Sequence, residues 1–176
     1  KYQNEDGLPY CLPCIPGTYE NQTGSKKCIA CDAGQHQNLA GMATCLDCIA
    51  GRYMNSVGAV NCLDCNPGTF ENGTGSKACK ACREGQHQDA SGNETCLGCK
   101  VGQYMNGMGA VDCLDCNPGT FENATGSKAC KACREGQHQD IAGNVTCLRC
   151  QVGRYMDGNG ATNCQPCIPG THENRL

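Results

Sequence analysis

Cysteine recurs in this chain as Cys-x-x-Cys pairs spaced 17 residues apart, without one insertion or deletion. An unbroken internal period marks a repeat array, in which each short segment contacts its neighbours and no shared core grows with chain length. We therefore expect the cysteines, rather than a hydrophobic interior, to decide the fold. The ten pairs begin at Cys11, Cys28, Cys45, Cys62, Cys79, Cys96, Cys113, Cys130, Cys147 and Cys164.

Apolar residues are too few to form a shared core. The chain has 20 cysteines among 176 residues, yet Leu, Ile, Val and Phe together number 22 and Trp is absent. This cysteine content is typical of disulfide scaffolds, and a chain this poor in apolar residues would be disordered without crosslinks. The net charge of −3 favours neither nucleic acid nor an anionic membrane. No stretch reaches the roughly 20 apolar residues of a membrane span.

Every repeat has the same internal pattern, Cys-x-x-Gly-x-aromatic-x-(Asn/Asp)-x-x-Gly, as in residues 14–24. A glycine at a fixed position indicates a backbone angle that other residues resist, or a close approach to a disulfide. The Asn or Asp before the second glycine fits a turn. We predict a small disulfide-rich repeat array, an elongated rod of irregular hairpins with short β-strands. Helices are not expected, because glycine is frequent and no helical apolar period occurs.

Three kinds of repeat alternate, so the full period is 51 residues. The first contains Pro-Gly-Thr-(Phe/Tyr)-Glu-Asn, the second Gly-Gln-His-Gln and the third Tyr-Met-(Asn/Asp). Residues 62–112 and 113–163 match at 40 of 51 positions. We interpret the chain as a piece of a longer array. Its predicted divisions are the end of a preceding repeat at 1–10, three copies at 11–61, 62–112 and 113–163, and the start of a fourth copy at 164–176.

The disulfide connectivity has two regular solutions. If neighbouring pairs joined first to first and second to second, as Cys11–Cys28 with Cys14–Cys31, they would be used two at a time. The 51-residue period holds three pairs, so near-identical copies would then be crosslinked differently. We favour a running ladder instead, which joins the second cysteine of one pair to the first of the next and leaves Cys11 and Cys167 without a partner in this segment. Its disulfides are Cys14–Cys28, Cys31–Cys45, Cys48–Cys62, Cys65–Cys79, Cys82–Cys96, Cys99–Cys113, Cys116–Cys130, Cys133–Cys147 and Cys150–Cys164.

The loop between two cysteine pairs resembles a known extracellular module. Cys14-Ile15-Pro16-Gly17-Thr18-Tyr19 followed by Cys28, and Cys65-Asn66-Pro67-Gly68-Thr69-Phe70 followed by Cys79, are similar to the cysteine-rich repeats of Eph-receptor-like and tumour-necrosis-factor-receptor-type ectodomains. The resemblance covers nearly the whole chain from Cys11 on. In the receptor-type modules this loop is closed by its own two end cysteines, which supports the running ladder.

Five Asn-x-Thr sequons fall in two fixed phases of the repeat. N-glycosylation takes place in the secretory lumen, where disulfides also form, so both features indicate an extracellular or cell-surface protein. We expect no cofactor apart from covalent glycans, and we expect these at least on the sequons in the first kind of repeat. Asn21, Asn72 and Asn123 lie at the turn of the first kind of repeat, and Asn93 and Asn144 lie just before a cysteine pair in the second.

Metal and redox sites are the main alternatives for the cysteines. Zinc would take four thiolates per ion and would also use the pairs two at a time, and no βαβ pattern suggests a thioredoxin-like centre. Residues 157–160 resemble a calcium loop only in part, because the closing Glu is absent. All four histidines take the aromatic position, where we expect them to pack as Tyr and Phe do rather than bind metal. They are His36, His87, His138 and His172.

The acidic residues are scattered by repeat phase, and the sequence has no Ser-His-Asp set or phosphate-binding loop. We therefore expect no enzyme but an extracellular structural protein, a glycosylated and disulfide-stiffened fibre, stalk or surface filament. It would self-associate or continue as the same array, without nucleic acid or membrane contact. The alternatives are a receptor or adhesion ectodomain that binds a protein ligand, and a protist surface antigen. Interface hot spots are rich in Trp, Tyr and Arg, and no copy stands out in these residues.

Overall fold

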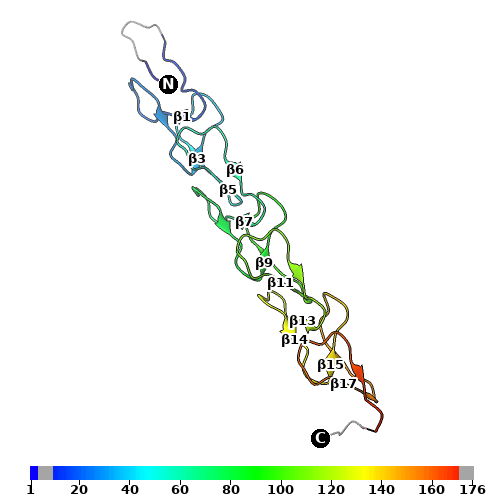
Figure 1. Ribbon diagram of the computed structural model, residues 1–176. Helices are drawn as coiled ribbons and strands as arrows, with labels where there is room; N and C mark the ends of the chain where they lie inside the picture. The colour runs from blue at the N-terminus through cyan, green and yellow to red at the C-terminus, as the bar shows by residue number, and fades with distance from the viewer. Residues whose placement is uncertain (4–9, 171–176) are drawn as a thin grey trace. The chain divides into compact units, whose positions relative to one another are not determined.

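The computed structural model describes residues 1–3 and 10–170, where the strands are two residues long and pair in nine antiparallel sheets (Figure 1). As predicted, this part of the chain has short hairpins at 17-residue intervals and no helix. A single bridge between Tyr2 and Leu12 precedes them. The strand pairs are β1 (Thr18–Tyr19) with β2 (Ile29–Ala30), β3 (Gln35–His36) with β4 (Leu46–Asp47), β5 (Arg52–Tyr53) with β6 (Leu63–Asp64), β7 (Thr69–Phe70) with β8 (Lys80–Ala81), β9 (Gln86–His87) with β10 (Leu97–Gly98), β11 (Gln103–Tyr104) with β12 (Leu114–Asp115), β13 (Thr120–Phe121) with β14 (Lys131–Ala132), β15 (Gln137–His138) with β16 (Leu148–Arg149), and β17 (Arg154–Tyr155) with β18 (Gln165–Pro166).

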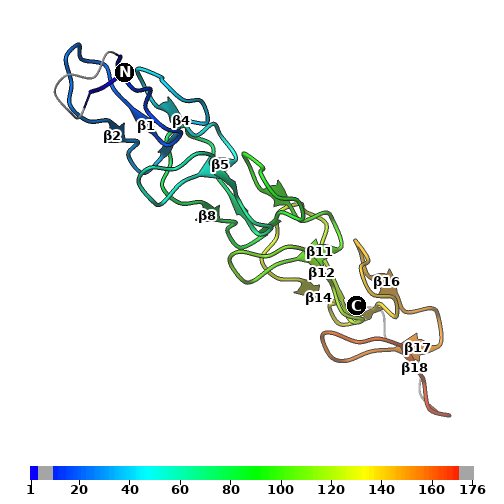
Figure 2. The ribbon, with the colours of Figure 1, turned by 90° about the horizontal axis from the view of Figure 1, so that it is seen from above.

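The chain divides into two compact parts. The first part comprises Lys1–Ala81 and Gln88–Cys96, and the second comprises Cys82–His87 and Leu97–Leu176. Within the first part the hairpins from β1 to β8 follow one another in chain order, and within the second part so do those from β11 to β18 (Figure 2). Neighbours in sequence are therefore neighbours in space within each part, as repeat arrays require.

A disulfide closes each hairpin beside its strand pair. In the first hairpin Tyr19 pairs with Ile29, and the Cys14–Cys28 disulfide joins the chain beside them with a Cα separation of 5.7 Å. Cys82 and Cys96 are also disulfide-bonded, whereas Cys11 and Cys167 carry free thiols. Seven further disulfides repeat the 5.7 Å separation: Cys31–Cys45, Cys48–Cys62, Cys65–Cys79, Cys99–Cys113, Cys116–Cys130, Cys133–Cys147 and Cys150–Cys164.

Main-chain hydrogen bonds join each hairpin to the next. The first glycine of one repeat donates its N–H to the carbonyl oxygen that follows the aromatic position of the next repeat, as Gly17 does to Gln37 at 2.7 Å. The carbonyl oxygen of the same Gly17 accepts the N–H of Cys31 at 2.9 Å. Both bonds recur from repeat to repeat because they need no particular side chain. Further examples are Gly34 to Met54, Gly51 to Glu71, Gly102 to Glu122, Gly119 to Gln139, Cys48 to Gly34 and Cys116 to Gly102.

In six repeats, the first glycine is required both by its backbone conformation and by the lack of space for a Cβ. Gly85 has a φ of +77°, and a Cβ at this position would overlap the carbonyl oxygen of Gly126, in the hairpin after next. The sequence predicted either an unusual backbone angle or a close approach to a disulfide. The angle is confirmed, whereas the close approach is to the main chain of a later hairpin. Gly17, Gly34, Gly51, Gly102 and Gly119 meet a later glycine carbonyl in the same way.

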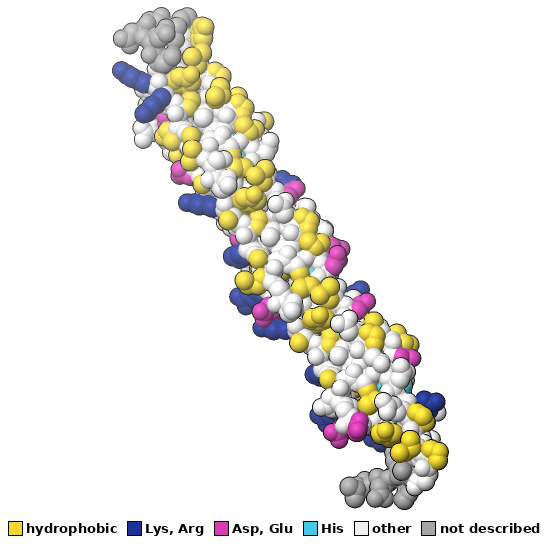
Figure 3. Space-filling model, in the orientation of Figure 1, with side chains coloured by type: hydrophobic (Ala, Val, Ile, Leu, Met, Phe, Trp, Pro, Cys, Tyr) yellow, Lys and Arg dark blue, Asp and Glu magenta, His cyan; other side chains and the backbone are white. Residues whose placement is uncertain are grey.

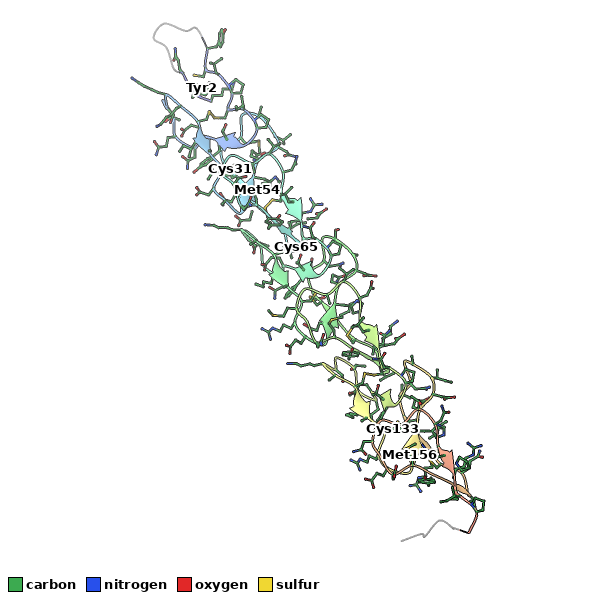
Figure 4. The ribbon with its side chains drawn as sticks, viewed as in Figure 1. Tyr2, Cys31, Met54, Cys65, Cys133 and Met156 are labelled. Atoms are coloured by element: carbon green, nitrogen blue, oxygen red, sulfur yellow. A yellow bond between two sulfur atoms is a disulfide. The ribbon has the colours of Figure 1, made fainter. Side chains whose placement is uncertain are left out.

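The interior consists of sulfur and a few polar side chains. The second cysteine of the pairs from Cys14 to Cys133 is fully buried, and Figure 4 labels Cys31, Cys65 and Cys133 among them. The residue after the aromatic position is the other buried side chain. Leucines on the second strand, such as Leu46 and Leu114, stay about half exposed, and apolar side chains recur over the visible surface (Figure 3). Glu20, Gln37, Met54, Glu71, Gln88, Glu122 and Gln139 are the buried residues at this position.

Candidate functional site

The buried residue after the aromatic position organises the turn that follows it. In the first kind of repeat, the Glu71 carboxylate accepts the N–H of Gly73 at 3.0 Å. In the second kind, the Gln37 side-chain oxygen accepts the N–H of Leu39 at 3.0 Å, and its Nε2 donates to the Thr44 carbonyl oxygen at 2.9 Å. Buried polar groups are costly unless they are hydrogen-bonded, and in both of these kinds of repeat the buried side chain bonds its own turn.

In two copies, a lysine and a sequon asparagine join this buried glutamate. Lys80 Nζ lies 2.9 Å from Glu71 Oε1 and 3.1 Å from Asn72 Oδ1. We name these three residues, and their equivalents Glu122, Asn123 and Lys131, the Glu–Lys–Asn clusters. In the later cluster both distances from Lys131 Nζ are 2.9 Å.

The hairpin register places each lysine in its cluster. Lys80 pairs across the strands with Phe70, and Lys131 pairs with Phe121. Lys131 Nζ lies 5.9 Å from the centroid of the Phe121 ring, within range of a cation–π contact. The Lys131 ammonium group therefore lies near both the aromatic ring and the turn that contains Asn123.

The surroundings of Glu71 favour its charged form. Burial raises the pKa of this carboxyl, but hydrogen bonds from Lys80, Gly73 N–H and Ser76, with the charge of Lys80, lower it by more. The pKa of Glu71 therefore lies below its ordinary value of 4.5. The pKa of Glu122 is lowered in the same way by Lys131 and its own turn.

The first copy lacks the lysine. Ile29 takes its place, across the strands from Tyr19. Glu20 remains buried and accepts the N–H of Gln22 at 2.6 Å. That bond is the main cause of the lowered pKa of Glu20. The turn therefore forms without the lysine, which makes the first copy a natural comparison for the other two.

The two sequon phases have different surroundings. Asn21, Asn72 and Asn123 are exposed at the turn, whereas Asn93 and Asn144 are half-buried. The Asn93 carbonyl oxygen accepts the N–H of Glu71 at 3.3 Å, and that of Asn144 accepts the N–H of Glu122 at 3.2 Å. The second phase is thus part of the bonding between consecutive hairpins.

The sequence reasoning identified the sequons but missed the clusters around two of them. The recurrence of Glu, Gln and Met after the aromatic position, with a 51-residue period, was a signal of burial. A lysine at one offset in copies two and three, at Lys80 and Lys131, was a second signal.

The remaining candidates do not gather into a chemical site. His36 Nδ1 lies 3.2 Å from the Val60 carbonyl oxygen, and His87 and His138 make the equivalent contact. His172 lies outside the described residues. Disulfide bonds hold 18 of the 20 cysteines, so these are not zinc thiolates. Residues 1–3 and 10–170 contain no group of three or more His, Cys, Asp or Glu residues that could bind a metal ion.

An open hollow lies in the second part of the chain. Its lining includes His138, Arg149, Gln151, Arg154 and Asn163. At the position equivalent to Arg149, Asp47 of the first copy lies against Gly75, in the hairpin after next. The hollow is thus a surface that other copies use for stacking, and we assign it no ligand.

Comparison with known proteins gives one family. The sequence model of the family described as tyrosine-protein kinase ephrin type A/B receptor-like matches residues 1–41, 17–65, 34–78, 68–112, 85–129 and 102–145. No curated protein matches the chain. Among solved structures, a chain of the human RANKL/OPG complex matches at 20% identity, covering 99% of this chain and 98% of its own. Its TM-score is 0.23, from which we draw no structural conclusion. The described residues form no helix able to span a lipid bilayer.

Proposed function

Because the chain belongs to the tyrosine-protein kinase ephrin type A/B receptor-like family, we propose that it is a non-catalytic structural array, part of a glycosylated fibre, stalk or surface filament. Its cysteine-rich repeats resemble receptor ectodomains, and its disulfides indicate an extracellular or secreted protein. In this role the array continues as the same repeat or associates with further copies.

The main-chain hydrogen bonds between consecutive hairpins are the observation that best supports the proposal. Each step uses the same bonds, such as Gly17 N–H to Gln37 O at 2.7 Å and Gly34 N–H to Met54 O at 2.7 Å. Bonds of this kind transmit load through the backbone at every step and do not depend on one specialised copy. A spacer needs this property, whereas an active site needs one place where several groups converge.

The buried carboxylates support the absence of catalysis. The Glu71 carboxylate accepts the N–H of Gly73 and forms an ion pair with Lys80. The Glu122 carboxylate does the same with the N–H of Ala124 and with Lys131. Hydrogen bonds that favour the charged form lower a carboxyl pKa, which is opposite to the raised pKa of a general acid. Their arrangement fits a role in holding turns.

Deletion of one full period tests the spacer role. Removing residues 62–112 joins Asn61 to Cys113 and preserves the repeat phase. Small-angle X-ray scattering and electron micrographs should show a particle shortened by the length of three hairpins, with native circular dichroism retained. A maximum dimension that does not change with the number of copies would contradict the proposal.

A receptor or adhesion ectodomain is the second candidate, favoured by the family match and by exposed side chains that differ between copies two and three. Away from the hollow, copies two and three differ at Ala90 and Ile141, and at Glu94 and Val145. Ile141 and Val145 are 62% and 41% exposed, and exposed apolar side chains can mark protein-interaction sites. If a protein ligand binds here, Ile141→Ala with Val145→Glu, which installs the residues of copy two, should abolish binding and leave the fold intact.

A further inference from the structure

We propose that the exposed turn sequons Asn21, Asn72 and Asn123 carry N-linked glycans and that Asn93 and Asn144 do not. The inference rests on the proposed extracellular location and adds which of the five sites are modified. All five have the same Asn-x-Thr acceptor sequence, so the distinction comes from the folded structure.

At the turn sequons, a glycan is compatible with every contact of the asparagine. The Oδ1 atoms of Asn72 and Asn123 accept hydrogen bonds from Lys80 and Lys131 at 3.1 and 2.9 Å. The amide oxygen and nitrogen are separate atoms on Cγ, so the oxygen can accept the lysine hydrogen bond while the nitrogen carries the sugar. Glycosylation of Nδ2 keeps the amide oxygen as an acceptor, and the Glu–Lys–Asn cluster survives.

At the other two sequons, a glycan would compete with stacking. Asn93 and Asn144 are half-buried, and their carbonyl oxygens accept the N–H groups of Glu71 and Glu122 at 3.3 and 3.2 Å. The Asn93 Nδ2 itself donates to the Ala90 carbonyl oxygen at 3.3 Å. A bulky sugar on this nitrogen would compete with the Ala90 bond, and it would have to fit beside a main chain that bonds the preceding hairpin. In chains modified there before folding, the hairpins should stack poorly on one another. Such chains should be lost during secretion.

The modification transfers an oligosaccharide from a lipid carrier to the asparagine side chain. The side-chain nitrogen forms a bond to C1 of a lipid-diphosphate-linked oligosaccharide, and the bond between C1 and the diphosphate oxygen breaks. One Nδ2 hydrogen leaves as a proton, and the lipid diphosphate departs with the electron pair. The co-reactant is supplied in the secretory lumen of cells that glycosylate asparagine. The protein contributes only the acceptor and a fold in which the product fits.

Site-specific glycopeptide mapping tests the proposal on the full chain secreted from a glycosylating eukaryotic cell line. We expect sugar on Asn21, Asn72 and Asn123, and unmodified Asn93 and Asn144. Substantial occupancy of Asn93 or Asn144 in the folded, secreted protein would overturn the proposal, as would empty turn sequons. If the chain instead stays inside the cell with its thiols reduced, the proposed extracellular role fails as well.

Two matched variants remove an acceptor sequence and leave its asparagine in place. Thr74→Ala destroys the sequon of Asn72, and Thr95→Ala destroys that of Asn93. Both threonines are exposed, and the Gln88 side chain bonds only the main-chain oxygen of Thr95, at 2.8 Å, so folding should be retained. Thr74→Ala should lower the intact mass by one glycan, and Thr95→Ala should lower it by the change of side chain alone. A glycan lost from Thr95→Ala, or none lost from Thr74→Ala, contradicts the assignment.

Discussion

Two glycines on opposite sides of one contact separate backbone conformation from lack of space. Gly85 and Gly126 have φ angles of +77° and +71°. A Cβ at Gly85 would overlap the Gly126 carbonyl oxygen, whereas the nearest atom to a Cβ at Gly126 is the Gly85 oxygen at 3.9 Å. Alanine at either position has the strain of a left-handed backbone, but only alanine at Gly85 also has a clash.

The two substitutions should differ by several kcal/mol. Left-handed backbone costs an L-residue about 1–2 kcal/mol, which is the whole expected effect of Gly126→Ala. At Gly85 the overlap adds roughly 1–3 kcal/mol of overpacking. A displaced Gly85 also weakens its bonds to Met105 and Cys99, 2.7 and 2.9 Å long, at about 1 kcal/mol each. Gly85→Ala should therefore cost about 4–7 kcal/mol.

Native-state amide hydrogen exchange measures these losses locally, which matters because repeat arrays need not unfold in one step. A tenfold change in protection corresponds to about 1.4 kcal/mol. With disulfides intact, Gly126→Ala should lower the protection of the Cys99 amide about tenfold, and Gly85→Ala should lower it roughly 1,000-fold or more. Equal losses in the two variants would refute the account of the contact between hairpins.

Three further predictions concern sulfur and the buried polar residues. Reduction by dithiothreitol should abolish the native circular dichroism, because cysteines form most of the interior; a reduced sample with an unchanged spectrum would disprove this. Lys80→Ile, which installs the residue of the first copy at Ile29, should cost about 1 kcal/mol at pH 7. The pKa of Glu71 is held below 4.5, so this stabilisation is present above that pH and is lost as the pH falls through the lowered pKa. Denaturation at pH 7 and pH 3 should therefore show a difference between wild type and variant that shrinks in acid, and an equal difference at both pH values would exclude the ion pair. Gln88→Glu should destabilise its turn by about 1–3 kcal/mol, because the Thr95 carbonyl oxygen then faces a carboxylate instead of its donor; unchanged thermal unfolding would contradict this.

The hairpins and their period were predictable because cysteine and glycine carry local information. A glycine such as Gly85, repeated every 17 residues, indicates a positive φ in any unit that contains it. The same glycine gives no indication in sequence that its Cβ would meet Gly126. That contact depends on how far the chain advances in two repeats, which the three-dimensional stacking decides.

The surroundings of the sequons were only partly predictable. A turn position was evident for Asn72 from the glycines near it. The burial of Glu71 and the reach of Lys80 to Asn72 depend on the register that pairs Phe70 with Lys80. Charged residues usually lie at the surface, so glutamate beside an aromatic residue gave no reason to expect an interior carboxylate.

Non-reducing peptide mapping of the secreted protein tests the central claim most directly, since the account depends on disulfides that close each hairpin. Proteolysis should release crosslinked peptides that contain Cys14 with Cys28, Cys31 with Cys45 and so on through Cys150 with Cys164. Peptides that join Cys11 to Cys28, or cysteines that are mostly free or metal-bound in the native protein, would contradict it.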